Sequence, residues 1–350
     1  MRVVQVVSDS DRRGAQVFAT ELGRVLIDQG FDVSTVALVP GRSDATIDVA
    51  SLTASSHWIR GLPALRRRTS DVDLVVAHGS TSLPAAVLAA GAPFVYRSIG
   101  DLPQWVTGGA RRAWVGWMLR RARGVTVLWP ELVPFVTHEL GVDADRVAVI
   151  PNAVDVSRCA VRSADEAAAA RQQLDVDPSR PVVAHVGALA PEKRVAQLVD
   201  AAADAGVQLL LAGDGPERAE LERRAHERGL TARFLGSVAD PGPVYAAADV
   251  VALASSTEGQ PAVLIEAALS GRAVVAPRVG GVPGVVTDGV TGVLYAGGRA
   301  ALAEALGRAV DHSEALGAAA RAPALARFDV EVVGRQWAMW LEQLQVAQAK

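Results

Sequence analysis

Short Val-rich apolar runs alternate along the chain with longer segments that are rich in Ala, Leu and Arg. In the first half the runs are RVVQVV, DVSTVAL, VDLVVAH, PFVYRS, GVTVLW and VAVIP, and residues 14–29, 81–90 and 130–140 have helical spacing. Strands that helices cover on both faces of a parallel sheet read as continuous apolar runs. This pattern predicts a doubly wound, Rossmann-like α/β domain over residues 1–155.

The alternation is interrupted after Pro151 by a polar, Ala-rich stretch and then starts again. The runs PVVAHVGAL, VQLLLAGDG, ARFLGSV, DVVALASS, AVVAP and GVLYAGG predict a second domain of the same class over residues 156–328. Residues 329–350 have apolar positions near helical spacing, so we expect an amphipathic helix that packs back on the N-terminal domain. The predicted fold is α/β, with two Rossmann-like parallel-sheet domains facing a cleft and with the 152–180 segment and the tail near Phe328 as hinges.

Composition narrows the function classes. The 350 residues are 50% hydrophobic and 21% charged with a net charge of -3, which is typical of a globular protein and gives no sign of nucleic-acid binding. The single Cys159 excludes an intrachain disulfide. Apolar runs end well before the roughly 18 residues of a membrane span, and the first is too short for a signal peptide. We therefore expect a cytoplasmic protein.

The segment DVVALASSTEGQPAVLIEAALSG carries two carboxylates at the place where such sheets bind ligands. It predicts a strand over 249–253, a polar loop, and a helix that begins at Pro261 and ends before Gly271. Ligands bind at the carboxyl ends of parallel strands. Glu258 in the loop and Glu266 in the second helical turn could face one site. Alternatively, Glu258 only complements the helix dipole and Glu266 is a solvated surface residue.

The next strand, AVVAP, is followed by RVGGVPGVV. Gly280 and Gly281 permit close backbone approach ahead of a helix that we expect to begin at Pro283. Paired glycines before a helix N-terminus form a cradle for phosphate. A structural turn would also explain the glycines.

In this order, the motifs resemble those of the retaining glycosyltransferase family 4, whose members have the GT-B fold. Glu258 and Glu266 match the family's Glu-x7-Glu pair, and Gly280 and Gly281 match its Gly-Gly loop. The resemblance covers nearly the whole chain, through the segments RGAQVFATELGRVLIDQGFDV, VIPNAVD, VGALAPEKR, LLLAGDGPERAELE, FLGSV and TDGVTGVLY.

The resemblance implies transfer of a hexosyl group, with retention, from a nucleoside diphosphate sugar to a hydroxyl acceptor, without a cofactor. We expect no required metal, because the Asp-x-Asp sequences at 9–11, 71–73 and 175–177 lie beside strands and turns, where Asp is ordinary. Glu266 would accept hydrogen bonds from the ribose, Glu258 would lie beside the donor sugar, and Lys193 would face the diphosphate. A diol suits an acceptor-only carboxylate, and a leaving diphosphate suits a cation; Lys193 could instead be an ordinary surface residue. The other expected donor-site residues are Gly14, Gly187, Arg194, Gly259, Gln260, Pro261, Gly280 and Gly281.

The chain departs from the family pattern at several positions. Ala188 replaces a phosphate-loop Arg, and Arg194 stands where the family usually has Gly, so we hypothesise that Arg194 partly compensates. No His ends the strand PFVYRS. The usual role of that His therefore cannot be carried over. We expect Arg97 and Asp101 on the acceptor side and His78 as a catalytic residue, although His78 could be a plain strand-end residue.

Gly284 and Ala153 are further departures, standing where the family has Glu and Gly. Two rival functions stay open because of such changes. One is a sugar-nucleotide epimerase of the same fold, and the other is a non-catalytic nucleotide-sugar-binding relative.

The segment 111–123 is the most basic and Trp-rich part of the chain. It could contact an anionic membrane surface peripherally. The alternative is a helix packed on the sheet with an Arg-rich solvent face. We interpret His185, inside VVAHVG, as a core histidine.

Overall fold

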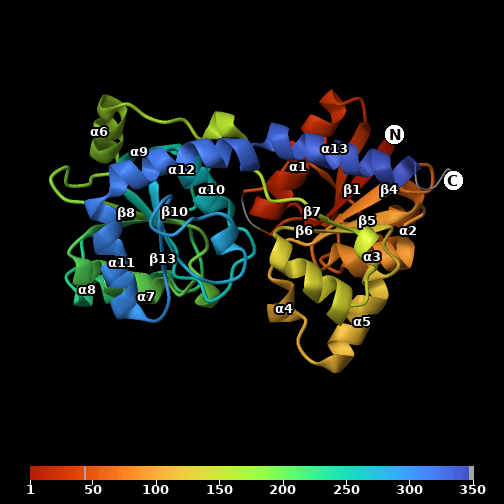
Figure 1. Ribbon diagram of the computed structural model, residues 1–350, viewed down its shortest axis with the longest axis horizontal. Helices are drawn as coiled ribbons and strands as arrows, with labels where there is room; N and C mark the ends of the chain where they lie inside the picture. Colours follow the sequence, from red (N-terminus) through yellow and green to blue (C-terminus); the bar gives the residue numbers. More distant parts are fainter. Residues whose placement is uncertain (43–44, 347–350) are drawn as a thin grey trace. The chain divides into compact units, whose positions relative to one another are not determined.

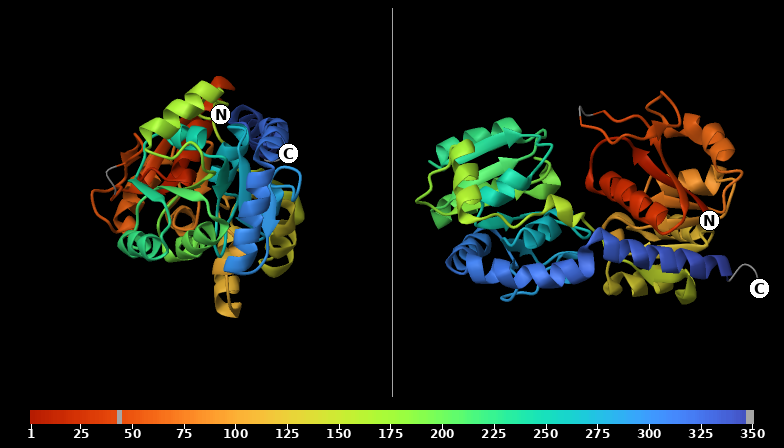
Figure 2. Two further views of the ribbon diagram at one scale, coloured as in Figure 1. Left: turned by 90° about the vertical axis from the view of Figure 1, so that its left-hand side faces the viewer. Right: turned by 90° about the horizontal axis from the view of Figure 1, so that it is seen from above.

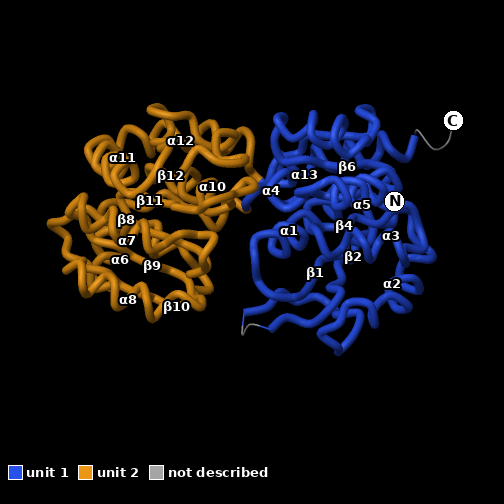
Figure 3. Tube along the Cα trace, turned by 90° about the horizontal axis from the view of Figure 1, so that it is seen from below, with its two compact units in different colours: residues 1–154, 330–350 blue, residues 155–329 orange. Residues whose placement is uncertain are grey.

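The computed structural model describes residues 1–42 and 45–346, which form two compact units (Figure 3). Unit 1 contains residues 1–154 and the C-terminal helix α13 (Val330–Val346), and unit 2 contains residues 155–329. In Figure 2 the helix α13, drawn in blue, lies along unit 1 although it comes from the far end of the chain. The expected amphipathic C-terminal helix is therefore present and packs on unit 1.

Unit 1 is built on a parallel sheet with the strand order β3-β2-β1-β4-β5-β6-β7 (Figure 1). All six predicted apolar runs are strands, and β3 is an additional exposed pair of residues without an apolar run to predict it. The strands are β1 (Arg2–Asp9), β2 (Asp32–Val39), β3 (Ala50–Ser51), β4 (Leu74–His78), β5 (Phe94–Arg97), β6 (Gly124–Val127) and β7 (Val147–Val149).

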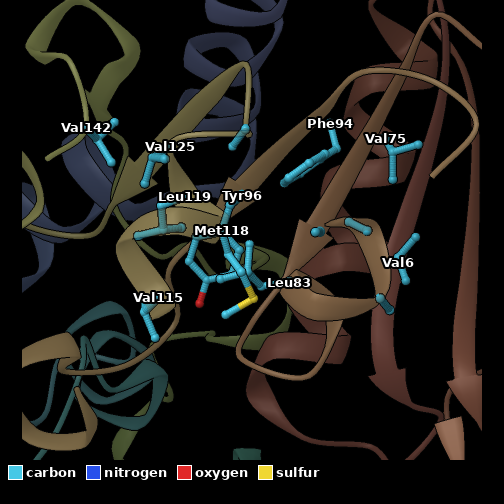
Figure 4. Packing of buried hydrophobic residues seen from close by; sticks show 14 of the residues in the cluster. Val6, Val75, Leu83, Phe94, Tyr96, Val115, Met118, Leu119, Val125 and Val142 are labelled. Carbon is cyan, nitrogen blue, oxygen red and sulfur yellow. The ribbon is translucent and has the colours of Figure 1, made fainter. Parts of the chain in front are cut away.

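Helices cover both faces of this sheet. One face packs against α1 (Gly14–Asp28) and α13 through residues such as Phe18 and Trp337. The other face packs against α2 (Leu62–Arg68), α3 (Ser82–Ala89) and α5 (Gly109–Leu119), and Figure 4 shows part of this core. The short helix α4 (Leu102–Trp105) follows β5. Burial on both faces is the reason that the strands read as continuous apolar runs.

One expected helix of unit 1 is irregular. Residues 130–140 form a 3-10 turn at Pro130–Leu132 and a π-helix at Phe135–Glu139 instead of one α-helix. Pro134 has no backbone N–H, so it cannot form the α-helical hydrogen bond to the carbonyl of Pro130. The prediction of a regular helix here was wrong, because Pro134 interrupts the α-helical hydrogen bonds.

Unit 2 contains a second parallel sheet with the strand order β10-β9-β8-β11-β12-β13. Each of the six runs predicted for this domain is a strand. The strands are β8 (Val182–Val186), β9 (Gln208–Ala212), β10 (Ala232–Gly236), β11 (Val250–Ala252), β12 (Ala273–Pro277) and β13 (Val293–Tyr295).

Unit 2 is covered by seven α-helices among the described residues. The helices α7 (Val195–Ala205), α8 (Arg218–Glu227) and α11 (Arg299–Asp311) pack on one face of the sheet. The helices α6 (Ala164–Gln173), α9 (Gly242–Ala247) and α10 (Ala262–Leu269) pack on the other. The long helix α12 (Ser313–Phe328) contacts α10 and β12.

The helix that we expected to begin at Pro283 is a single 3-10 turn, Val282–Gly284. That prediction was wrong. Gly284 and the β-branched residues Val282, Val285 and Val286 all have weak helix propensity, so the turn does not propagate. Within the described residues, no helix has the length and apolar character needed to cross a bilayer.

Candidate functional site

The candidate site lies within unit 2, in the loops that follow β8, β11 and β12 at the carboxyl end of the sheet. Backbone contacts hold these loops together. The amide of Ser256 donates to the carbonyl of Glu192 at 2.9 Å, and the amide of Gly281 donates to the carbonyl of Gly259 at 2.9 Å. Three segments that are far apart in the sequence therefore form one edge, where ligands of this sheet class bind.

Glu258 and Lys193 form an ion pair at this edge. The Lys193 Nζ lies 2.7 Å from the Glu258 Oε1, and the Ser255 hydroxyl donates to the same oxygen at 2.6 Å. The Glu258 side chain is only 9% exposed, whereas that of Lys193 is 26% exposed. Among the described residues no hydrogen bond reaches the Glu258 Oε2. The pair thus presents a positive charge and a carboxylate oxygen that can still accept a hydrogen bond.

Glu266 lies in α10 and is oriented by a tyrosine. The Tyr245 hydroxyl in α9 donates to the Glu266 Oε2 at 2.5 Å, and the Arg158 Nη2 lies 3.9 Å from its Oε1. Burial, and then the charge of Glu266, raise the pKa of the Tyr245 phenol well above its ordinary value, so the phenol stays protonated and donates. The Glu266 side chain is 13% exposed. One carboxylate edge is therefore fixed while the residue stays accessible.

The glycines of the predicted site differ in whether close packing or backbone conformation requires a residue without a side chain. An added Cβ at Gly213 would meet the Gly187 carbonyl oxygen at 1.8 Å, so the loops after β8 and β9 cross too closely for a side chain. Gly280 has a φ of 48°, in the region that glycine adopts without strain. Gly14 is exposed at the start of α1 in unit 1, and an added Cβ there would meet nothing within 4 Å.

Arg194 has a left-handed backbone, with φ 48° and ψ 39°, between a 3-10 turn that ends at Lys193 and the first residue of α7. This conformation costs a non-glycine residue roughly 1–2 kcal/mol, which is a physical reason for glycine at this position. The Arg194 side chain is exposed, and its charge acts on the Tyr295 phenol. Its compensation for Ala188 stays a prediction.

The remaining predicted donor residues adjoin Glu258. Gln260 is buried, with 4% exposure, and Pro261 is the residue immediately before α10. Gly259 supplies the carbonyl that binds the Gly281 amide.

Unit 1 contains the predicted catalytic residue His78 and the predicted acceptor-side residues Arg97 and Asp101. His78 ends β4 and Arg97 ends β5, and the two are register partners on adjacent strands. Their exposures are 2% and 1%, so neither presents a surface to an acceptor molecule in this conformation. Asp101 immediately precedes α4 and is partly exposed. The catalytic role of His78 and the acceptor-side roles of Arg97 and Asp101 stay predictions.

The basic, Trp-rich segment includes α5. Val115, Met118 and Leu119 are buried against the sheet, as the packed-helix interpretation expects. Trp114 is 54% exposed and stacks on Trp117 with ring centroids 5.0 Å apart. The same helix thus has a buried apolar face and an exposed aromatic, basic face, and membrane contact stays a prediction.

Sequence reasoning missed Ser255 and Tyr245, which hold the two glutamates. Ser255 lies in the same loop as Glu258, whereas Tyr245 comes from a different helix, so no spacing rule could have paired it with Glu266. His185 is fully buried and bonds the Ala252 carbonyl through Nδ1 at 3.2 Å, which confirms its interpretation as a core residue. In the part of the chain that the structure describes, no group of three or more His, Cys, Asp or Glu side chains could hold a metal ion.

Comparison with known proteins identifies the family. The profile described as "Glycosyltransferase Family 4" matches residues 12–158, and that described as "Glycosyl transferases group 1" matches residues 180–312. The chain therefore belongs to the family 4 type of glycosyltransferases, and its two parallel-sheet units confirm the predicted GT-B class of fold.

Two curated proteins are similar to this chain. A 2-deoxystreptamine glucosyltransferase of Streptomyces kanamyceticus is 33% identical over 233 residues, which is 63% of this chain and 57% of that protein. A D-inositol 3-phosphate glycosyltransferase of Nocardia farcinica is 35% identical over 278 residues, which is 73% of this chain and 58% of that protein. The chain thus spans little more than half the length of these relatives.

Solved structures show the same fold. HepE of Anabaena, crystallised in complex with UDP and glucose, has a TM-score of 0.85 at 24% identity and covers 98% of this chain and 100% of its own. Sucrose-phosphate synthase of Thermosynechococcus elongatus has a TM-score of 0.84 at 22% identity and covers 99% and 100%.

Proposed function

We propose that the protein is a retaining glycosyltransferase that moves a hexosyl group from a nucleoside diphosphate sugar to an acceptor hydroxyl in the synthesis of a glycan, glycolipid or small glycoside. The observation that carries the proposal is the pairing of Lys193 with Glu258 at the carboxyl edge of the unit 2 sheet, together with the tyrosine-held Glu266 on α10, the helix that follows the Glu258 loop. The family membership and the fold shared with a UDP-bound structure support it.

Each side chain has a role that suits its contacts. The Tyr245 hydroxyl fixes Glu266, whose carboxylate would accept hydrogen bonds from the two ribose hydroxyls. Lys193 would stabilise the diphosphate as negative charge develops on the leaving group. Glu258 would contact a hydroxyl of the donor sugar through Oε2, since Oε1 already binds Lys193 and Ser255.

Retention would need no protein nucleophile. The acceptor would attack from the face that the nucleotide leaves, and the departing phosphate would take up the acceptor proton. The protein then contributes positioning and charge stabilisation, which favours a well-ordered pair such as Lys193–Glu258 over a mobile base.

The test is thermal stabilisation of the purified protein by UDP, GDP and ADP and by their sugars. We expect one nucleotide to raise the melting temperature, because a ligand that binds only the folded state stabilises it by mass action. The shift should be lost in Glu266→Gln and kept in the matched surface variant Glu304→Gln, on α11 of the same unit. No shift with any nucleotide would contradict the proposal.

Product analysis separates the rival functions. Slow release of free sugar from the stabilising donor, without acceptor, would support transfer chemistry and exclude a purely binding role. Interconversion of donor epimers would instead identify an epimerase. Release of the α-configured sugar or glycoside from an α-configured donor would support retention.

We also propose a peripheral contact of unit 1 with an anionic lipid surface through α5. The exposed Trp114 and the Arg121 guanidinium, 3.6 Å from the centroid of the Trp117 ring, supply an aromatic and a cationic group. Co-sedimentation with anionic vesicles should fall in Trp114→Ser and stay unchanged in Ile59→Ser, which removes an exposed apolar residue elsewhere in unit 1. Equal binding by both variants would contradict the contact.

A further inference from the structure

A row of polar residues crosses the middle of the unit 1 sheet beneath α1 and α13. His78 on β4 pairs in register with Arg97 on β5, and Arg97 pairs with Thr126 on β6. Val76 and Val95, two residues earlier on their strands, belong to the core under α1 and α13, so alternation places the row on the same face. All three row residues are at most 2% exposed.

Two aromatic side chains cover the row. The Arg97 guanidinium carbon lies 3.7 Å from the centroid of the Phe18 ring in α1. The rings of His78 and Trp337, the latter in α13, have centroids 6.5 Å apart, and Trp337 is fully buried. The row is therefore enclosed between strands of the N-terminal half and a helix from the end of the chain.

The charge of Arg97 is not balanced by any acidic side chain among the described residues. Its guanidinium donates to the Asn152 Oδ1 at 3.0 Å, and neither Nε nor Nη1 has a partner. A buried guanidinium is normally paired with a carboxylate or another anion, because burial removes its hydration. The Phe18 ring attracts the charge but leaves these N–H groups without acceptors.

Other buried polar atoms near Arg97 also lack hydrogen-bond partners, and most of them are donors. Five of the seven buried, unpartnered side-chain atoms in the described chain belong to this face: His78 Nδ1, Arg97 Nε and Nη1, Thr126 Oγ1 and Trp337 Nε1. Gln5 donates through Nε2 to the Ala19 carbonyl, so its Oε1 accepts from the His78 Nε2 at 2.9 Å. The His78 Nδ1 is then a bare acceptor, and the other four atoms carry hydrogens.

We propose that this row, centred on Arg97, binds a small inorganic anion of the size of chloride inside unit 1. An excess of donors around an uncompensated cation suits an anion, whereas water alone would leave the charge unbalanced. A water molecule on the anion would donate to the His78 Nδ1. Bound there, the anion would join β4, β5 and β6 to α13 and stabilise the packing of the C-terminal helix. The proposed transfer reaction plays no part in this assignment.

The electrostatics of the row agree with the geometry. Burial lowers the pKa of Arg97 to about 9, and no carboxylate acts to raise it. Burial, and then the charge of Arg97, lower the pKa of His78 well below its ordinary value, so His78 is neutral and does not compete for the anion as a second cation.

Bromide diffraction tests the site directly on the full chain. Crystals grown or soaked with sodium bromide should show one anomalous peak per chain within hydrogen-bond distance of the Arg97 Nε or Nη1. Electron density at this position without an anomalous bromide peak would mean that a water molecule occupies the site. That result would overturn the proposal.

Thermal unfolding gives an independent readout. The melting temperature should rise with chloride concentration when methanesulfonate keeps the ionic strength constant. The rise should disappear in Arg97→Met and persist in Arg67→Met, which removes an exposed arginine of α2. Thr126→Val removes one donor and should shift the response to several-fold higher chloride.

The remaining outcomes are also decisive. Equal chloride responses in wild type and Arg97→Met, with no bromide peak, would overturn the proposal. A response to phosphate but not to chloride or bromide would contradict the small size of the anion and indicate a polyatomic group such as a substrate phosphate. If Arg97→Met does not fold, the wild-type chloride response and the bromide peak decide the question.

Discussion

The two units handle buried charge in opposite ways. In unit 2 the cation Lys193 has a carboxylate partner at 2.7 Å, and both members keep some exposure at the sheet edge. In unit 1 the cation Arg97 is enclosed, with one amide oxygen and an aromatic face as its partners. A paired, partly exposed charge is available to a ligand. An enclosed cation without a carboxylate partner needs an anion to balance its charge. The same fold therefore holds a paired, partly exposed charge at a sheet edge in one unit and an internal polar row in the other.

The largest effect should come from breaking the unit 2 pair. Lys193→Ala removes the cation expected to stabilise the leaving diphosphate, and we expect a fall of about 10²–10³-fold in kcat, as for the loss of one charge-stabilising group elsewhere. Steady-state release of the nucleotide measures it. Arg308→Ala, an exposed cation of α11 in the same unit, is the control. A loss of less than about tenfold would show that Lys193 is not at the diphosphate.

Acidification should act on the buried histidines of both units. Burial lowers the pKa of His185 from 6.5 to about 4, so between these values the unfolded chain takes up a proton that the folded chain does not. The free energy of unfolding should therefore fall as the pH drops below about 6.5. The contribution of His185 to this fall should end near pH 4 and total on the order of 3 kcal/mol.

Urea unfolding at pH 7 and at pH 4.5 measures this loss. In His185→Asn the loss of stability that comes from protonation of His185 should vanish. The loss that comes from His78 in unit 1 should remain. An unchanged pH dependence in this variant would show that His185 is not the group that titrates.

The tyrosine that holds Glu266 should have an intermediate effect. Tyr245→Phe removes a hydrogen bond to a charged group, and we expect nucleotide affinity to fall about tenfold, which corresponds to about 1.4 kcal/mol. Isothermal titration with the stabilising nucleotide measures it. The control is Tyr295→Phe, which loses only a 3.4 Å contact with the Leu253 carbonyl. Equal losses in both variants would argue against a positioning role for Tyr245.

The smallest effect should come from Arg194, an exposed cation beside the paired one. Arg194→Ala should weaken donor binding about threefold, within the range of exposed charge interactions. Arg194→Gly should weaken it equally but be more stable than the alanine variant, because alanine keeps the strain of the left-handed backbone. Unchanged donor affinity in both would refute compensation for Ala188.

Much of the fold followed from local patterns. Twelve apolar runs predicted twelve strands of two parallel sheets, because strands buried on both faces need little information from elsewhere in the chain. The irregular helix at 130–140 and the short turn at Pro283 were mispredicted, since proline and glycine there override helical spacing.

The sequence by itself determined the two α/β units, the order of the motifs and the family, because apolar periodicity and motif spacing are properties of contiguous segments. It also predicted Glu258, Glu266 and Lys193 as neighbours of one ligand. Only the tertiary structure decided that Tyr245 holds Glu266, and that Phe18 and Trp337 close over Arg97 and His78. Those contacts join segments far apart in the chain, and burial of a charge depends on which distant helices cover it.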